Sequence, residues 1–231
     1  MYLEALNADT VERLYGDALS ALAVMQACAP TQGLPSYDAA LLRRELELFP
    51  QWLLERRLGL NLSSEEQSAL EQVFRLLIHA ALEQPRVFVH RDYHSRNLMV
   101  TASPSPGILD FQGAVLGPVT YDLVSLLRDC YVRWPRAKVQ DWAWGYFELA
   151  VQSGILRAEH EGDFQRWFDL MGVQRQLKAS GIFTRLYLRD GKPGYLEDIP
   201  RTLGYVLEVA PSYPSLAPLA DLIAQRVMPR L

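Results

Sequence analysis

Apolar residues recur three or four positions apart over most of this chain, which is the spacing that places them on one face of an α-helix. Short stretches rich in proline, glycine and serine separate these runs and mark turns. The pattern predicts eight helices, over residues 11–25, 39–58, 63–83, 121–130, 135–153, 163–188, 195–209 and 215–227.

Local signals indicate where some of these helices begin and break. Asp9 with Glu12, and Ser63 with Glu66, have the spacing of a capping box, in which each side chain accepts a hydrogen bond from the other residue's backbone amide. Pro50 lies inside the second predicted helix. It should break or kink that helix, because proline lacks a backbone donor and clashes with the preceding turn.

The period changes in the middle of the chain, where three short apolar runs are bounded by polar loops and by the turn Ser-Pro-Ser-Pro. They are predicted strands, at residues 86–90, 98–100 and 107–110. The sequence therefore predicts a mainly α fold with a small β insertion (α+β). It predicts one unit over 1–231, in which helical segments 1–85 and 113–231 flank strands and loops at 86–112.

Composition excludes some classes of partner. A net charge of −4 and a pI near 5.6 do not favour binding to a nucleic-acid backbone or an anionic membrane. The sequence contains neither the ~18 consecutive apolar residues of a membrane-spanning helix nor a signal peptide. We therefore expect a cytoplasmic protein, in which Cys28 and Cys130 are buried free thiols.

The most informative polar residues lie on the loops between the predicted strands. Asp92 is followed five residues later by Asn97, and Asp110 comes thirteen residues after that. Phosphoryl transfer with Mg²⁺ requires such a set, because one carboxylate orients the attacking hydroxyl and two oxygen ligands hold the metal against the nucleotide phosphates. Each residue also has a simpler interpretation: an Asx-turn for Asp92, a turn residue for Asn97, and a strand-end cap for Asp110.

With these residues in place, the chain resembles the catalytic C-terminal lobe of the aminoglycoside phosphotransferase and choline kinase family, which has a protein-kinase-like fold. The resemblance is carried by His90-Arg91-Asp92, Asn97 and Asp110-Phe111-Gln112. It extends to the segments 117–127 and 43–52. It implies an enzyme that uses ATP and Mg²⁺, with Asp92 as catalytic base and with Asn97 and Asp110 as ligands of the metal and its nucleotide.

Within that family, segment 174–181 looks most similar to bacterial kinases that phosphorylate the anomeric hydroxyl of N-acetylmuramate and N-acetylglucosamine in cell-wall recycling. The resemblance thus implies an amino-sugar substrate. An aminoglycoside or choline-type substrate is the alternative within the enzyme class. A catalytically silent binding module is the alternative outside it.

One departure from the family concerns the nucleotide-binding lobe, which precedes the catalytic loop and supplies a glycine-rich loop and a lysine. Here the residues before Asp92 are predicted to be helical, and the first lysine of the chain is Lys138. We therefore expect a catalytic lobe without its nucleotide lobe, inactive alone if that lobe is required. The apolar surface exposed at the former interface would then favour self-association.

The resemblance assigns supporting roles to three further residues. His90 is expected to be structural, bracing the metal loop, and Asp122 is expected to brace the catalytic loop through backbone amides. His94 lies inside the loop, where it either reaches the substrate or packs.

Four charged residues are candidate substrate contacts. Glu45 and Glu47 would accept hydrogen bonds from sugar hydroxyls, unless they form a solvated helix face. Arg175 and Lys178 are three positions apart and share a helix face, where they would bind a lactyl carboxylate, unless they are surface charges.

Overall fold

The computed structural model describes residues 1–231 and divides them into two compact units, each built from two separate stretches of chain. The first unit contains residues 1–37 and 83–168, and the second contains 38–82 and 169–231. The expectation of a single kinase-like lobe over 1–231 stays a prediction, as does self-association through an exposed surface.

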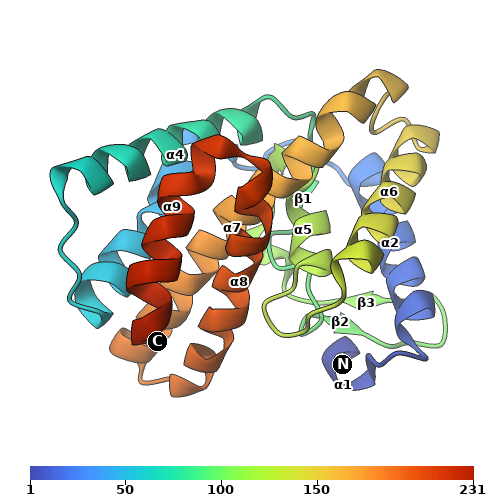
Figure 1. Cartoon of the computed structure of the whole chain (residues 1–231). Helices are drawn as coiled ribbons and strands as arrows, with labels where there is room; N and C mark the ends of the chain where they lie inside the picture. Colours follow the sequence, from blue (N-terminus) through green and yellow to red (C-terminus); the bar gives the residue numbers. More distant parts are fainter. The chain divides into compact units, whose positions relative to one another are not determined.

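The first unit combines helices with all the strands (Figure 1). Its hydrophobic core includes Leu14 and Leu22 of α2, Val89 of β1 and Leu126 of α5, all of which have no exposed surface. The elements of this unit are α1 (Tyr2–Ala5), α2 (Val11–Cys28), β1 (Arg86–Val89), β2 (Leu98–Met99), β3 (Gly107–Ile108), β4 (Val115–Pro118), α5 (Tyr121–Leu127), α6 (Arg136–Gln152) and the first turns of α7 (Glu161–Asp190).

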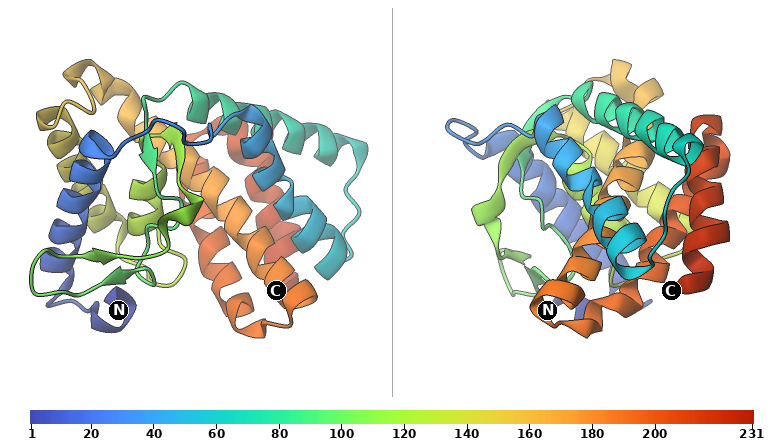
Figure 2. Two further views of the ribbon diagram at one scale, coloured as in Figure 1. Left: turned by 180° about the vertical axis from the view of Figure 1, so that it is seen from behind. Right: turned by 90° about the vertical axis from the view of Figure 1, so that its left-hand side faces the viewer.

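The strands form two antiparallel pairs. β1 pairs with β4 from Arg86 opposite Pro118 to Val89 opposite Val115, and β2 pairs with β3 through Leu98 opposite Ile108. The β2–β3 hairpin lies beside α1 (Figure 2), and the backbone amide of Leu3 in α1 donates to the carbonyl of Ser95, in the loop before β2. The sequence pattern placed no strand beyond residue 112, so β4 is an addition that comes from long-range pairing with β1.

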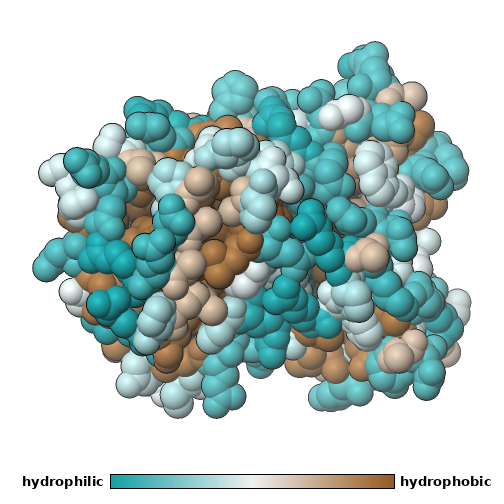
Figure 3. Space-filling view, in the orientation of Figure 1, coloured by the Kyte–Doolittle hydropathy of each residue, from teal (hydrophilic) through white to brown (hydrophobic).

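The second unit is entirely helical. Figure 2 shows the later part of α7 beside α8 and α9, with α4 packed on α9. The elements of this unit are α3 (Ala39–Leu46), a π-helical segment (Phe49–Arg57), α4 (Ser64–Leu82), the later turns of α7, α8 (Ile199–Val209), α9 (Ala217–Leu222) and a second π-helical segment (Ile223–Val227). In Figure 3, apolar side chains gather around α9. A cavity of about 280 Å³ lies there between α4 and α9.

The predicted mainly α fold with a small β part is confirmed. The Ser63–Glu66 capping box is also confirmed, since the backbone amide of Ser63 donates to Glu66 and that of Glu66 donates to Ser63. Pro50 interrupts its helix as expected: α3 ends at Leu46, and Pro50 lies in the first turn of the π-helical segment that follows.

Two local predictions are wrong. α2 begins after Thr10 without an Asp9–Glu12 capping box, and the Glu12 carboxylate instead binds the ammonium of Lys138 and the indole N–H of Trp142. Cys130 is a buried free thiol, but Cys28 is exposed, because the final residue of α2 lies at the surface. No helix of the structure is long and apolar enough to cross a membrane.

Candidate functional site

Residues 90–97, here called the Asp92 loop, connect β1 to β2 in the first unit. Two tight turns shape this loop, since the amide of His94 donates to the Asp92 carbonyl and the amide of Asn97 donates to the His94 carbonyl. The loop exposes the Asp92 side chain, while Tyr93 is fully buried and its hydroxyl donates to the Ala18 carbonyl of α2.

The Asp122 carboxylate holds the beginning of this loop. Asp122 is fully buried in the first turn of α5, and its two oxygens accept hydrogen bonds from the backbone amides of His90, at 2.6 Å, and Arg91, at 3.0 Å. These are the hydrogen bonds that the expected bracing role requires. They also support Arg91 in a left-handed backbone conformation (φ +76°), which non-glycine residues seldom adopt.

The structure brings Asp92, Asn97 and Asp110 to one place. The side-chain amide of Asn97 donates to the Asp92 carbonyl at 3.1 Å, and the Asn97 carbonyl accepts from the amide of Leu109 at 3.0 Å. Because Leu109 immediately precedes Asp110, the β2–β3 pairing carries Asp110 to the same side as the Asp92 loop. Asp92 and Asp110 are exposed and Asn97 is half-buried, so all three are accessible to ligands.

Asp110 and Arg91 are the two non-glycine residues with positive φ in the chain. A left-handed conformation costs roughly 1–2 kcal/mol for an ordinary residue and is tolerated best by Asn and Asp. Such residues concentrate at functional sites, where the surrounding structure holds them in place. Here both belong to the segments that carry the candidate catalytic and metal-binding oxygens.

The oxygens of Asn97 and Asp110 fit a hard cation. One oxygen of Asp110 accepts a hydrogen bond from Gln112, at 2.6 Å, and the second oxygen can face a ligand. Asn97 uses its amide N–H on Asp92, so its oxygen points the other way. The structure contains no group of three or more His, Cys, Asp or Glu side chains suited to a metal. Two oxygens with several waters nevertheless suit Mg²⁺, which needs few protein ligands.

The two histidines of the loop are both buried. Burial lowers the pKa of His90 below its ordinary value, which favours a neutral ring that accepts a hydrogen bond from the Asp92 amide at 3.3 Å. His94 packs edge-on against the ring of Tyr131, with 5.4 Å between the ring centres. This contact shows that the His94 ring packs against another side chain. That His94 also contacts a substrate stays a prediction.

Sequence reasoning missed Asp129, a second buried carboxylate at this loop. One of its oxygens accepts from the amide of Ser95, and the other accepts from the amide of Tyr131, both at 2.9 Å. The only sequence signal is an aspartate near the end of the apolar segment 121–130, which is predicted to be helical. Such a pattern has no evident function until the fold brings Ser95 to it.

The second unit contains the candidate substrate residues Glu45, Arg175 and Lys178. The ammonium of Lys178 lies 2.9 Å from the Glu45 carboxylate, and Gln174 also donates to Glu45. All three candidates are buried, so the alternatives of a solvated helix face for Glu45 and of surface charge for Arg175 and Lys178 are wrong. The physical reason is that Gln174 and Lys178 of α7 contact Glu45 of α3, so this polar face is packed against another helix.

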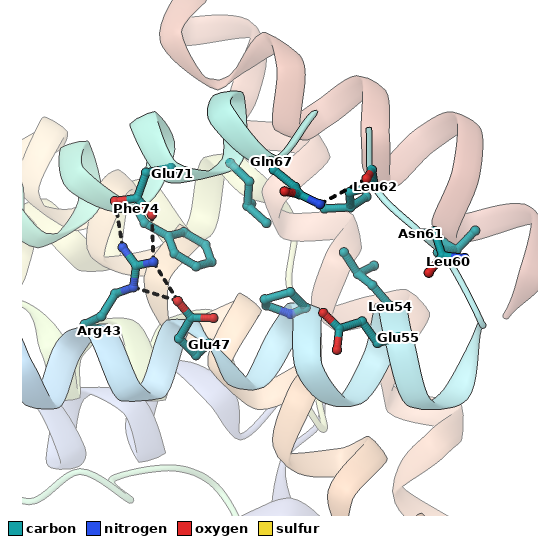
Figure 4. A pocket seen from close by; sticks show the side chains of 12 residues that line it. Arg43, Glu47, Leu54, Glu55, Leu60, Asn61, Leu62, Gln67, Glu71 and Phe74 are labelled. Atoms are coloured by element: carbon teal, nitrogen blue, oxygen red, sulfur yellow. Dashed lines mark hydrogen bonds and ion pairs between the residues drawn. The ribbon is translucent and has the colours of Figure 1, made fainter. Parts of the chain in front are cut away.

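Glu47 is bound by Arg43, whose guanidinium also makes a bidentate pair with Glu71 of α4 (Figure 4). These three side chains lie at one end of a cavity of about 320 Å³ between α3, the π-helical segment and α4. The Arg43 guanidinium also lies 5.3 Å from the ring centre of Phe74. Glu47 thus borders an open cavity, while part of its charge is already neutralised.

Residues 2–152 match the sequence model of the phosphotransferase enzyme family, also called APH, which is more than half of the chain. This chain belongs to the phosphotransferase enzyme family. The segment that matches the family model includes the Asp92 loop, Asp110, Asp122 and Asp129.

Several curated kinases are similar to the chain along nearly its whole length. N-acetylmuramate/N-acetylglucosamine kinase of Pseudomonas putida is 51% identical over 225 residues, which is 97% of this chain and 66% of that protein. The kinase of the same name from Pseudomonas aeruginosa is 47% identical and that from Neisseria meningitidis is 44% identical, over 96% and 91% of this chain and 66% and 63% of theirs. The chain therefore spans just under two thirds of the length of these relatives.

Solved structures of two other kinases share the fold at low sequence identity. An ethanolamine kinase of Plasmodium vivax superposes with a TM-score of 0.63 at 11% identity, covering 90% of this chain and 63% of that one. A choline kinase of Cryptosporidium parvum reaches 0.50 at 12% identity, covering 94% and 71%. These similarities confirm the expected kinase-like fold.

Proposed function

We propose that this chain is the phosphotransferase part of a sugar kinase that transfers the γ-phosphoryl group of ATP to the anomeric hydroxyl of N-acetylmuramate or N-acetylglucosamine. One observation carries the proposal: the Asp92 loop, with Asp110 on the adjoining segment after β3, occurs in a chain that is 51% identical to a kinase named for these two sugars.

In this proposal Asp92 orients the sugar hydroxyl and accepts its proton. The carboxylate needs no unusual basicity, because the transition state of phosphoryl transfer is loose and the proton leaves late. Its position is set by the backbone. The Asp92 carbonyl is held by Asn97, and the Asp92 amide is held by the His90 ring, so the carboxylate projects from a loop fixed on both sides.

Asn97 and Asp110 would hold Mg²⁺ against the phosphates of the nucleotide. The bound metal would neutralise charge that develops on the phosphoryl oxygens. The residues of this chain supply two fixed oxygens on neighbouring segments, and the Leu109–Asn97 backbone hydrogen bond sets the distance between those segments.

The buried ion pair reduces the number of residues that we propose as substrate contacts. Lys178 and Glu45 bind one another, which supports a structural role for both in joining α7 to α3. Arg175, buried on the same helix, is our candidate for the carboxylate of N-acetylmuramate, since an arginine can bind a carboxylate in bidentate fashion. Glu47 and His94 are weaker candidates for sugar hydroxyls.

The test is Mg-ATP-dependent phosphorylation of N-acetylmuramate, N-acetylglucosamine, kanamycin and choline. It would use this chain, and also this chain joined to the part of the P. putida kinase that the similarity does not cover. Asp92→Asn should lower kcat by at least ~100-fold on the two sugars. Asp141→Asn, at an exposed position of α6, is the matched control.

Turnover of either sugar that Asp92→Asn abolishes and Asp141→Asn preserves would support the proposal. Turnover of kanamycin or choline, with neither sugar phosphorylated, would show that the substrate is an aminoglycoside or choline-type compound and not one of these sugars. A joined protein that phosphorylates a sugar equally well with Asn at position 92 would overturn the role of Asp92.

A further inference from the structure

We propose that Asp129 is a positioning residue that holds the second half of the Asp92 loop, and that the two anchors of this loop, Asp122 in α5 and Asp129 two residues after α5, lie on one continuous buried segment. The inference rests on the proposed phosphotransferase function and adds a residue to it. It does not depend on which sugar is the substrate.

The first observation is the direct contact with the loop. Asp129 is fully buried, and its carboxylate accepts the backbone amide of Ser95 at 2.9 Å. Ser95 lies between Asp92 and Asn97, three residues after the first and two before the second. Ser95 is itself fully buried and its hydroxyl has no hydrogen-bond partner, so its backbone rather than its side chain makes the connection.

The second observation is the turn that Asp129 makes with Tyr131. The other oxygen of the carboxylate accepts the Tyr131 amide at 2.9 Å, which sets the direction of the chain after α5. The Tyr131 ring then contacts His94 edge-on, and the guanidinium of Arg96 lies 4.7 Å from the centre of the same ring. Asp129 and Tyr131 therefore contact three successive loop residues.

The third observation is the placement of the two anchors. Asp122, in the first turn of α5, holds the amides of His90 and Arg91, while Asp129 follows the last turn of the same helix. Every residue of α5 is buried, and a helix of seven residues is roughly 10 Å long. A loop attached through Arg91 and Ser95 to the buried segment 121–130 cannot shift as a whole without moving the core.

This arrangement affects catalysis through geometry. Asp92 lies between the two anchored amides, those of Arg91 and Ser95, and Asn97 lies two residues beyond the second. A displacement of about 1 Å can cost ~100-fold in rate. An anchor that only stabilised the fold would change the fraction of folded protein and leave the kcat of the folded protein unchanged. A positioning anchor changes kcat itself and leaves substrate affinity nearly unaltered.

Asp129→Asn tests the idea with little change in shape. The amide keeps one acceptor oxygen and turns an N–H₂ group toward one of the two backbone donors, so either Ser95 or Tyr131 loses its partner. We expect kcat to fall about 100-fold and the sugar KM to change less than about threefold, as for an interaction made mainly in the transition state. Asp141→Asn, in the same unit but exposed, should leave both parameters unchanged.

Amide hydrogen exchange gives a readout that does not require turnover. In Asp129→Asn, peptides that cover residues 93–97 should exchange at least about tenfold faster than in the wild-type chain, while peptides from α2 and α6 keep their rates. Unchanged exchange in the loop would overturn the proposal even if the wild-type chain phosphorylates none of the sugars. The experiment therefore distinguishes an error in the proposed sugar-kinase function from an error in the proposed role of Asp129.

Tyr131→Leu covers the case in which Asp129→Asn does not fold. Tyr131 is only half-buried, and the substitution keeps the amide that Asp129 binds but removes the ring between His94 and Arg96. Faster exchange confined to residues 93–97 would support the proposal. Exchange equal to that of the wild-type chain, in a folded Tyr131→Leu protein, would overturn the claim that Asp129 acts on the loop through the Tyr131 ring as well as through Ser95.

Discussion

The Oδ2 atom of Asp122 lies 2.6 Å from the backbone nitrogen of His90, so a carboxylate with no exposed surface determines where the Asp92 loop begins. The Oδ1 atom of the same carboxylate accepts from Arg91, which is in the left-handed region. Asp122 therefore satisfies two backbone donors that the loop cannot satisfy internally.

Replacing Asp122 should lower the stability of the chain as well as its activity. In Asp122→Ala both amides lose their acceptor, and each unsatisfied buried donor costs roughly 1–3 kcal/mol. Urea unfolding would measure the loss, with exposed Asp141→Ala as the control. Equal unfolding midpoints for the two variants would show that the hydrogen bonds of Asp122 contribute little.

Breaking the Glu45–Lys178 pair should be costly because both charges are buried. Lys178→Met removes the ammonium that lies against the buried Glu45 carboxylate and should destabilise the chain by roughly 3–5 kcal/mol. The double variant Glu45→Gln/Lys178→Met should recover most of that loss, since the charge of Glu45 is removed together with that of Lys178. A double variant as unstable as the single one would contradict the assignment of Lys178 to a structural pair.

The Arg43–Glu71 pair predicts a specific dependence on pH. The hydrogen bond and the charge of Arg43 lower the pKa of Glu71 below its ordinary value. Between the folded and unfolded pKa values the unfolded chain binds more protons, so this contribution is full above about pH 4.5 and is lost as the pH falls below it. Glu71→Gln should flatten that part of the stability curve.

Thermal unfolding between pH 3 and 7 would measure the effect of Glu71→Gln. Glu55→Gln, at an exposed position that borders the same cavity, is the matched control and should leave the acid limb of the curve unchanged. The same acid limb in Glu71→Gln and the wild-type chain would refute the linkage.

Two helical glycines should respond to alanine in opposite directions. A Cβ on Gly181 of α7 would lie 2.4 Å from the backbone of Leu48, so Gly181→Ala should cost roughly 1–3 kcal/mol through overpacking. Gly145 of α6 has nothing within 4 Å of the added carbon, and Gly145→Ala should stabilise the chain by up to ~1 kcal/mol. Unfolding midpoints would test this: Gly145→Ala should unfold at a higher midpoint than Gly181→Ala, and the reverse order would contradict the prediction.

The capping predictions show what local sequence can determine. Ser63 and Glu66 form their box because both partners lie within one turn, and the box persists although the Arg226 guanidinium also binds the Glu66 carboxylate. Glu12 has an equally suitable spacing to Asp9, but Lys138 and Trp142 bind it instead. Those partners are more than a hundred residues away along the chain, so no local rule predicts them.

The candidate site likewise has features that the sequence predicts and features that only the tertiary structure determines. The sequence alone determined the order and spacing of Asp92, Asn97 and Asp110, because the chemistry needs those residue types on loops between strands. Only the tertiary structure decided that Asp129 holds Ser95 and that Lys178 binds Glu45. A buried charge must be neutralised or hydrogen-bonded, and its partner comes from whichever segment the packing of the core brings beside it.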